Sequence, residues 1–296
     1  MNKNGSRTSR VRVIGQPDHL RVRPLSRSRS VLPFIRRRPV GVARAQPQPL
    51  GSPVVIGGGR AEVATGFMPT GGGGVVTAIA VTYNTRLLVE KSYQSIRKFY
   101  PDMPTILVDG SDPGNSTSDY VKSLASPLTT VMSFGHNVFH GPGMNAGINY
   151  CQTRYALLFD TDVELLEPCV GDMLAMMEED TFGVGFVIPT AFSGFGTWWP
   201  TPWRKEAWHP NTAPPTKGGW MPYLHPYFHL IDIQTYRKFP PYEHSGAPCT
   251  PTMLAIYRQG LSNKIIKQFK DMVNGTPKFV KHDGGGTCRR DARLCI

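Results

Sequence analysis

The first sixty residues of this 296-residue chain almost lack acidic side chains. They contain 13 lysines and arginines but a single acid, Asp18, while the whole chain has 33 Lys+Arg and 21 Asp+Glu. The net charge of +12 is therefore carried by this segment, and residues 61–296 are electrically balanced. A segment so rich in Arg, Ser and Pro buries too little apolar surface to offset the entropy cost of ordering. We expect residues 1–74, which end in Gly-rich stretches, to be a disordered basic tail and linker.

Long hydrophobic runs and paired cysteines are also missing. No stretch approaches the roughly 18–20 consecutive apolar residues of a membrane-spanning helix, and no apolar segment of a secretion signal follows the arginines. The five cysteines include no CxxC pair, which argues against a disulfide scaffold and a structural zinc site. We therefore expect a cytoplasmic protein without a transmembrane segment. The basic tail either touches nucleic acid or an anionic membrane surface, or is a solvated extension without a role.

The remainder of the chain has the pattern of an α/β domain. Continuous apolar runs, typical of strands buried on both faces, alternate with amphipathic stretches. The runs lie at 75–81, 105–108, 130–134 and 155–159, and the helices are expected at about 87–100, 120–124 and 143–153. This alternation predicts a Rossmann-like, mostly parallel sheet flanked by helices. Ligands bind outside the carboxyl ends of such strands, where the chain has Thr82-Tyr83-Asn84, Asp109 and Asp160-Thr161-Asp162.

Asp160 and Asp162 directly follow the fourth apolar run. Residues two apart on a strand point to the same side, so both carboxylates can face one ion. Mg²⁺ and Mn²⁺ favour oxygen ligands and are commonly shared with substrate phosphates. Such an ion would neutralise a diphosphate as its bond to a sugar breaks. The alternative is an ordinary Asp-rich turn.

Four segments in order carry a resemblance to a known family: VTYN, ILVDGSD, GPGMNAGINY and LLFDTDVEL. Through them, residues 76–187 resemble the nucleotide-sugar-binding half of family 2 glycosyltransferases, which have the GT-A fold. The resemblance implies a nucleotide-diphospho-sugar donor, most commonly a UDP-sugar, and a divalent metal, Mn²⁺ or Mg²⁺, bound by Asp160 and Asp162. The implied donor-binding residues are Thr82, Tyr83, Asn84, Asp109, Gly141, Gly143, Asn145 and Asp160. One departure is Met144, which stands where the family often has an arginine, so the metal or another side chain has to supply that positive charge.

The same resemblance divides the folded part into a nucleotide-sugar-binding half, 75–190, and an acceptor-binding and catalytic half, 191–296. All five tryptophans lie between residues 198 and 220, among prolines. Aromatic ring faces suit sugars, although the same residues would also serve as a proline-stiffened loop that covers the sheet. The resemblance favours acceptor binding by Trp198, Trp199 and Trp203.

The catalytic base has to be a carboxylate within hydrogen-bond reach of the acceptor hydroxyl. The acidic pair usual in the family is not evident, because Ser245-Gly246-Ala247-Pro248 occupies its neighbourhood. Glu243 is the first candidate, with a surface acid as the alternative, and Asp232 is the second. His282, which precedes a Gly-rich stretch, resembles a C-terminal histidine that binds the metal or diphosphate in several GT-A enzymes; a structural histidine is the alternative. The other histidines show no convincing ligand spacing.

The sequence thus predicts a metal-dependent glycosyltransferase of the hexosyltransferase type. It would move a sugar from a nucleotide-diphospho-sugar to a carbohydrate or other hydroxyl acceptor, with inversion. A sugar-nucleotide pyrophosphorylase is disfavoured, since the Gly-rich basic signature of those enzymes is absent at Thr82-Tyr83-Asn84. A catalytically inert GT-A domain that binds carbohydrate or a partner is the alternative from another class.

Overall fold

Residues 55–56, 59–60, 62–64, 74–193, 218–243, 247–273 and 276–283 are described by the computed structural model. All of them belong to one compact unit, Pro47–Ile296. The segment 1–54 and the three tryptophans expected to bind the acceptor, Trp198, Trp199 and Trp203, lie outside the described residues. The predictions made for them therefore stay predictions.

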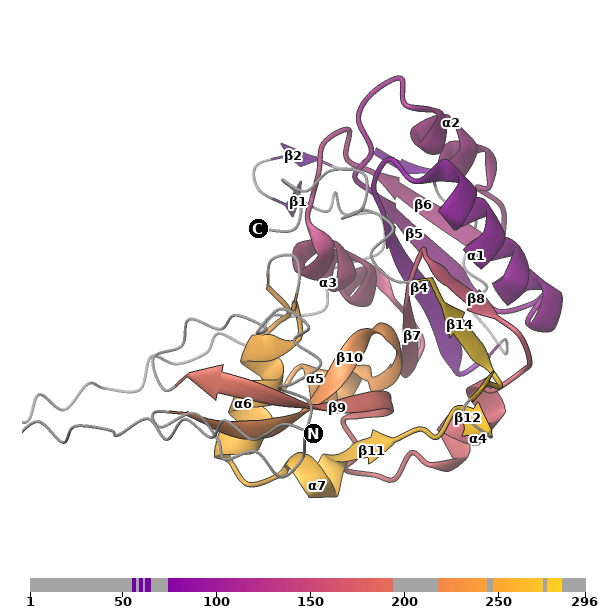
Figure 1. The fold of residues 1–296 in the computed structure, drawn as a ribbon. Helices are drawn as coiled ribbons and strands as arrows, with labels where there is room; N and C mark the ends of the chain where they lie inside the picture. Colours follow the sequence, from indigo (N-terminus) through magenta and orange to yellow (C-terminus); the bar gives the residue numbers. More distant parts are fainter. Residues whose placement is uncertain are drawn as a thin grey trace, which may run out of the picture. The chain divides into compact units, whose positions relative to one another are not determined.

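Four buried strands form the parallel centre of the main sheet (Figure 1). They match the four apolar runs of the sequence to within one or two residues: β4 (Val76–Thr82), β5 (Thr105–Asp109), β6 (Thr129–Ser133) and β7 (Tyr155–Asp160). The spatial order is β7-β4-β5-β6, and every neighbouring pair is parallel. The side chains of β5 and β6 are buried throughout, as expected of strands covered on both faces.

Four further strands extend this centre to eight, in the order β11-β9-β10-β7-β4-β5-β6-β3. β10 (Gly218–Asp232) runs antiparallel to both β7 and β9 (Gly183–Ser193), and β11 (Ile266–Gln268) is parallel to β9. β3 (Glu62–Ala64) pairs antiparallel with β6. Only β10 and β3 oppose the common direction, so the prediction of a mostly parallel sheet is confirmed.

Two expected boundaries differ from this arrangement. Strand β3 lies inside the segment 1–74 that we expected to be tail and linker, because its backbone completes the open edge of β6. The expected division between the halves, after residue 190, falls inside β9. The two halves thus contribute strands to one continuous sheet.

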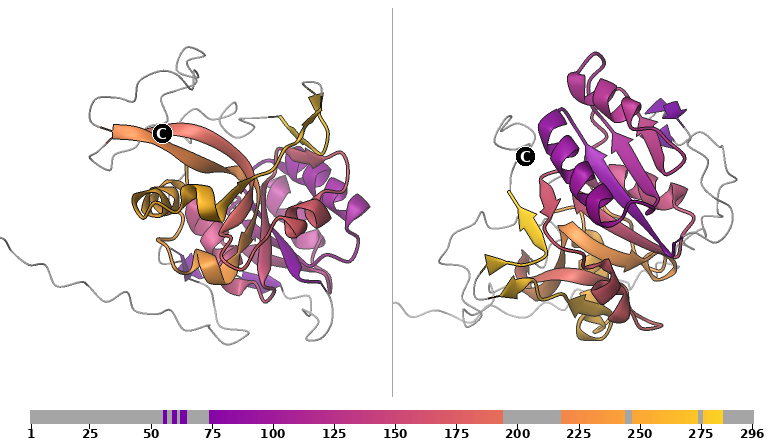
Figure 2. Two further views of the ribbon diagram at one scale, coloured as in Figure 1. Left: turned by 90° about the horizontal axis from the view of Figure 1, so that it is seen from below. Right: turned by 90° about the vertical axis from the view of Figure 1, so that its right-hand side faces the viewer.

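Helices cover both faces of the sheet (Figures 1 and 2). One face packs against α1 (Arg86–Phe99), α2 (Ser116–Ser123) and α4 (Val170–Ala175). The other packs against α3 (His140–Tyr150), α5 (Ile233–Tyr236), α6 (Thr250–Arg258) and α7 (Ser262–Ile265). Alternate strand residues feed the two hydrophobic clusters: Ala78 and Ala80 of β4 point to the first and Ile79 to the second. No helix among the described residues has the length and apolar character needed to cross a membrane.

Three two-stranded sheets accompany the main one. They pair β1 (Val55–Ile56) with β2 (Gly59–Arg60), β12 (Met272–Val273) with β13 (Thr276–Pro277), and β8 (Val163–Leu165) with β14 (Val280–His282). The last pair joins the strand that follows Asp162 to a strand near the C-terminus. It therefore decides what lies beside Asp162.

Helix α3 approaches β4 closely because it presents two glycines, four residues apart, to the strand. A Cβ atom at Gly143 would lie 2.7 Å from Cγ1 of Val81, and one at Gly147 would overlap Cγ2 of Ile79. Ile79 is 1% exposed, so its side chain has little room to move. The two glycines therefore set the distance between the helix and the sheet.

We expect Gly147→Ala to lower the free energy of unfolding by about 1–3 kcal/mol, because the added methyl group overpacks the core against Ile79. The matched control is Gly171→Ala in α4, where a Cβ atom would meet nothing within 4 Å. That variant should leave stability unchanged or raise it by up to about 1 kcal/mol. Urea denaturation of both variants checks the prediction, and equal midpoints would contradict it.

Candidate active site

The polar residues that follow three strands lie at one edge of the sheet, as the parallel arrangement predicts. Thr82, the last residue of β4, is paired with Asp109, the last residue of β5. On the other side of β4, Val81 is paired with Asp160, the last residue of β7. The three polar strand ends therefore gather at one edge as expected, with Asp109 and Asp160 on either side of β4.

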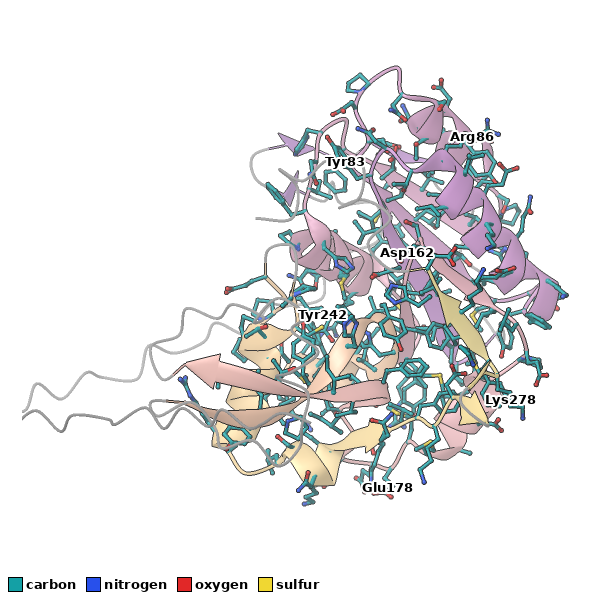
Figure 3. The ribbon with its side chains drawn as sticks, viewed as in Figure 1. Tyr83, Arg86, Asp162, Glu178, Tyr242 and Lys278 are labelled. Carbon is teal, nitrogen blue, oxygen red and sulfur yellow. The ribbon has the colours of Figure 1, made fainter. Side chains whose placement is uncertain are left out.

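Asp160, Asp162 and His282 form a cluster at this edge. Each offers one ligand atom, and these atoms lie within 4.8 Å of one another. Asp162 lies in the turn after β7 and not on the strand as expected, yet its carboxylate still joins the cluster. Figure 3 shows Asp162 beside β14. There His282 pairs with Val163, the amide of Asp283 donates to the carbonyl of Asp162 (3.0 Å), and His282 Nε2 lies 3.3 Å from Asp162 Oδ1.

Two carboxylate oxygens and one imidazole nitrogen make a donor set that fits a divalent metal ion. The side chains of Asp162 and His282 are 11% and 26% exposed, so both can be reached without opening the core. Three protein ligands leave coordination positions for water or for phosphate oxygens. The residues present are thus able to hold a metal, as the sequence predicts for all three.

His140 supplies a second ion pair that the sequence did not reveal. Its Nε2 lies 2.9 Å from Oδ1 of Asp160. Burial opposes the charge on both groups, but their mutual attraction raises the pKa of His140 and lowers the pKa of Asp160. His140 begins α3, so its position depends on how that helix docks on the sheet. The only sequence signal was its place at the start of the GPGMN segment.

Two aromatic residues of β10 have ring contacts with His282. The pairing of β10 with β9 is irregular between Leu224 and His229, and this irregularity carries His225 and Tyr227. The ring of Tyr227 stacks on that of His282, with centroids 4.3 Å apart and planes 10° from parallel. Burial lowers the pKa of His225 to about 4, which keeps this imidazole neutral. The stack fixes the orientation of His282, and no sequence pattern pointed to it.

The expected nucleotide-binding residues form a compact turn at the ends of β4 and β5. Asn84 has a φ of 49°, and its amide nitrogen Nδ2 donates to Asp112 Oδ2 at 2.7 Å. The hydroxyl of Tyr83 donates to the same oxygen at 3.4 Å. Asp109 Oδ1 accepts from the backbone of Ser111, whereas Asp109 Oδ2 is buried and has no hydrogen-bond partner within the part of the chain that the structure describes. The same is true of the hydroxyl of the neighbouring Thr82.

These two atoms are an exception that calls for a partner, since buried polar atoms in proteins are nearly always hydrogen-bonded. They lie on paired residues of adjacent strands, at the edge of the sheet where ligands bind. Asp109 Oδ2 can accept and the Thr82 hydroxyl can donate or accept. Among the described residues, the pair therefore has unused hydrogen-bonding capacity at this edge of the sheet.

The structure gives the expected donor-binding residues of α3 other neighbours. Gly143 faces Val81 in the core. A Cβ atom at Gly141 would come within 2.8 Å of the backbone of Glu243. The Asn145 side chain is hydrogen-bonded to the backbone of Tyr242. The three residues thus pack against the protein itself, and their assignment as donor-binding residues stays a prediction.

The two candidate bases lie at different ends of the sheet. Glu243 is exposed, its carboxylate has no hydrogen bond or ion pair among the described residues, and its backbone lies against Gly141, next to His140. Asp232 is paired across the strands with Tyr155, five residues before Asp160, which is about 17 Å along β7. Its carboxylate accepts from Arg154 Nε (2.8 Å) and from the amide of Thr235. Asp232 therefore caps α5 and is not brought to the cluster, contrary to its assignment as second candidate.

A comparison with sequence models of known families shows which family the chain belongs to. The model described as glycosyl transferase family 2 matches residues 77–244, more than half of the chain. The chain belongs to glycosyl transferase family 2. The matched region contains Asp160 and Asp162 and ends just after Glu243, while His282 lies beyond it. A search of curated proteins finds no match.

Several solved structures are similar to this family 2 chain. They include the mannosyltransferase PcManGT from Pyrobaculum calidifontis in complex with GDP-Man and Mn²⁺ (12% identity over 68% of this chain, TM-score 0.45). A second is S. aureus TarS 1-349, with 14% identity over 69% of this chain and a TM-score of 0.44. A third is glucosyl-3-phosphoglycerate synthase from Mycobacterium tuberculosis in complex with phosphoglyceric acid, with 14% identity over 65% of this chain and a TM-score of 0.41. The matches cover 58%, 59% and 68% of those chains, so this chain spans less than two thirds of the first two.

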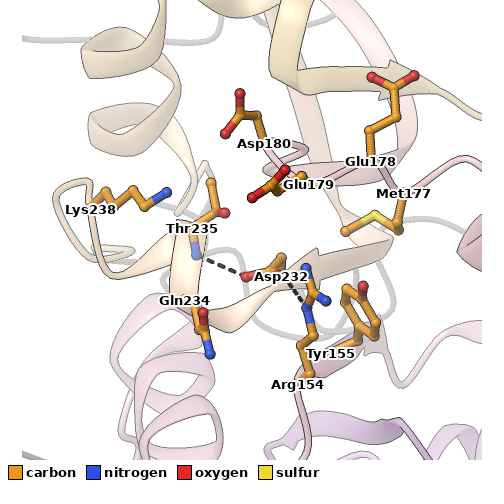
Figure 4. A pocket seen from close by; sticks show the side chains of 10 residues that line it. All are labelled: Arg154, Tyr155, Met177, Glu178, Glu179, Asp180, Asp232, Gln234, Thr235 and Lys238. Carbon is orange, nitrogen blue, oxygen red and sulfur yellow. Dashed lines mark hydrogen bonds and ion pairs between the residues drawn. The ribbon is translucent and has the colours of Figure 1, made fainter.

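A cavity of about 620 Å³ lies elsewhere on the family 2 domain (Figure 4). Asp232, Arg154 and Tyr155 line it, together with the acidic run Glu178-Glu179-Asp180. It lies at the end of β7 opposite Asp160, and Figure 3 shows Glu178 well away from Asp162. The cavity is therefore separate from the cluster of Asp160, Asp162 and His282, the candidate metal-ligand cluster.

His229 of β10 lies fully buried behind the candidate site. Its Nε2 is 3.1 Å from the hydroxyl of Tyr242, and burial lowers the pKa of His229 to about 3. The imidazole is therefore neutral in the folded protein at neutral pH, whereas in the unfolded chain it titrates near 6.5. Below that pH the unfolded state binds the extra proton.

We expect stability to fall as the pH drops from 7 to 5, with about 2 kcal/mol of the loss due to His229. The sign follows from the lowered pKa: the contribution is complete above about 6.5 and is lost as the pH falls toward 3. His229→Gln should flatten the curve by that amount. Denaturant unfolding at several pH values measures it, and a variant with the wild-type slope would contradict the assignment.

Proposed function

We propose that this chain is a metal-dependent glycosyltransferase that uses a nucleotide-diphospho-sugar and transfers a hexose to a hydroxyl acceptor with inversion. The observation that carries the proposal is the Asp160–Asp162–His282 cluster at the carboxyl edge of a mostly parallel sheet. Family 2 membership supplies the reaction class. The cluster supplies a place for the diphosphate.

The donor would lie across the ends of β4, β5 and β7. Its base or ribose would satisfy the two unpaired buried atoms, Asp109 Oδ2 and the hydroxyl of Thr82. Tyr83 and Asn84 would border the same ligand from the turn after β4. An N–H or O–H of the nucleotide matches the accepting carboxylate, and UDP is the donor nucleotide we propose to test first.

The diphosphate would lie over the cluster, where a Mn²⁺ or Mg²⁺ ion held by Asp160, Asp162 and His282 would neutralise the leaving group. The chain's own side chains prepare this position. His140 holds Asp160 by an ion pair, and Tyr227 orients His282 by stacking. Met144, which replaces an arginine usual in the family, is buried in the core. His140 therefore supplies positive charge from the start of the same helix.

Glu243 is the residue we propose as base. Its exposed carboxylate is not engaged by another described residue, and its backbone lies beside the start of α3. In the transfer, the acceptor oxygen forms its bond to the anomeric carbon as the bond to the diphosphate breaks, and the acceptor proton moves to the carboxylate of Glu243. One displacement of this kind inverts the anomeric centre.

The parts of the prediction that involve other residues remain proposals. Acceptor binding by Trp198, Trp199 and Trp203 and a docking role for the basic tail concern residues outside the described ones. A cytoplasmic location likewise remains a prediction from the sequence.

A panel of nucleotide sugars with Mn²⁺ tests the reaction, with released nucleotide as the readout. Asp160→Ala and Asp162→Ala should each abolish turnover and weaken Mn²⁺-dependent UDP binding by at least about tenfold, because each removes a metal ligand. The control is Asp172→Ala, which removes an exposed acid of α4 that is not part of the cluster. Calorimetry that detects no Mn²⁺-dependent binding of any nucleoside diphosphate to the wild type would refute the proposal.

Glu243→Gln tests the base. The amide keeps the size of the side chain but cannot take up the acceptor proton, so kcat should fall by about 10²–10⁴-fold. Binding of Mn²⁺ and UDP should be unchanged, since Glu243 is not in the metal-ligand cluster. A variant with the wild-type rate would remove Glu243 from the reaction while leaving the donor site intact.

A further inference from the structure

The side-chain amide of Asn145 is hydrogen-bonded to two tyrosines, Tyr236 and Tyr242. Its Nδ2 donates to the carbonyl oxygen of Tyr242 at 2.6 Å, and its Oδ1 accepts from the backbone amide of Tyr242 at 3.2 Å. The same Oδ1 accepts from the hydroxyl of Tyr236 at 2.5 Å. One side chain of α3 thus holds both polar backbone groups of a residue 97 positions away.

The rest of Tyr242 is held equally firmly. The Tyr236 hydroxyl also accepts from the backbone amide of Tyr242 at 3.1 Å, and the two rings meet edge to face with centroids 4.9 Å apart. The hydroxyl of Tyr242 reaches Nε2 of His229 at 3.1 Å. The side chain is 1% exposed, so Tyr242 is an anchor fixed at its backbone and at its ring tip.

Glu243 follows this anchor directly. Its own amide donates to the carbonyl of Pro248 at 3.0 Å, and its backbone lies against Gly141, where any side chain would collide with it. Gly141 is adjacent to His140, whose imidazole contacts Asp160. The backbone of Glu243 is therefore fixed relative to the cluster, while its carboxylate extends into solvent without a partner among the described residues.

We propose that Asn145 is a positioning residue that acts through Tyr242 to hold Glu243 beside the metal-ligand cluster, in place of the donor contact implied by the sequence. The inference rests on the proposed function, since it gives Glu243 the role of base. A base has to lie within hydrogen-bond reach of the proton it takes, and displacements of about 1 Å can cost about 10²-fold in rate. The hydrogen bonds of Asn145 and Tyr236 to Tyr242 form a clamp, which limits such displacements at the residue next to the base.

A double-mutant cycle between Asn145→Ala and Glu243→Gln tests the proposal, with donor hydrolysis or transfer as the reaction. In the wild-type background, Asn145→Ala should lower kcat by about 10–100-fold, while KM for the donor and the Mn²⁺-dependent Kd of UDP stay within about threefold. In the Glu243→Gln background the same substitution should change kcat by less than about twofold, because the group it positions is already gone.

Two further variants separate positioning from loss of fold. Tyr236→Phe removes one hydroxyl from the clamp but leaves the bonds between Asn145 and Tyr242, so its kcat should lie between those of the wild type and Asn145→Ala. Thr181→Val is the matched control: it deletes a side-chain hydrogen bond to a backbone amide, that of Glu178, at the far end of the sheet. It should lower thermal stability without changing kcat.

The outcomes are distinguishable. An Asn145→Ala variant that loses donor affinity with kcat unchanged would make Asn145 a donor ligand and overturn the proposal. Equal losses of kcat in both backgrounds would overturn it too. Absence of turnover in the wild type would refute the proposed function instead. The clamp would then be tested alone by hydrogen exchange, which should speed up at the amides of Tyr242 and Glu243 in Asn145→Ala if Asn145 holds them; unchanged exchange would overturn it.

Discussion

The pairing of β14 with β8 is the contact on which the candidate active site depends. It brings His282 opposite Val163, the residue after Asp162, and so joins two segments more than a hundred residues apart. Burial holds the two paired strands in place, since Val163, Leu165 and Val280 all belong to the hydrophobic core that also contains residues of α1. Lys91 of α1 adds ion pairs to Glu164 (2.8 Å) and Asp283 (3.7 Å), but these groups are exposed or partly exposed, and such pairs contribute little. Apolar packing therefore places the third residue of the candidate metal site.

The features that the sequence predicts well are those with a local cause. The four central strands were recognisable because strands buried on both faces are continuous apolar runs, and their ends located Thr82, Asp109 and Asp160 at one edge. The sequence predicted that the carboxylates of Asp160 and Asp162 lie together, and they do. The reason differs from the expected one, because Asp162 reaches the cluster from a turn and not from an alternate position on the strand. The assignment of His282 depended on family resemblance, since nothing in its own neighbourhood indicates that β14 returns to β8.

The contacts that the sequence did not predict involve partners from distant parts of the chain. Gly141, Gly143 and Asn145 lie in the segment that resembles the family's donor-binding motif, yet their neighbours are Glu243, Val81 and Tyr242. Asp232 is acidic and lies in the expected half, but β10 runs antiparallel to β7 and carries it to the wrong end. The sequence specified which residue types were present, whereas strand direction and helix docking decided what they touch.

The charges of the site follow from the same constraints. Two carboxylates gathered at a partly buried edge repel each other and need positive partners. Here each has an imidazole, His140 beside Asp160 and His282 beside Asp162. An arginine is always charged and has no lone pair for a metal, whereas a neutral imidazole is a metal ligand. Met144 stands where the family often has an arginine. The positive partners of the two acids are imidazoles instead, His140 and His282. Residues 61–296 have no net charge, and within them each carboxylate of the Asp160–Asp162–His282 cluster is paired with an imidazole.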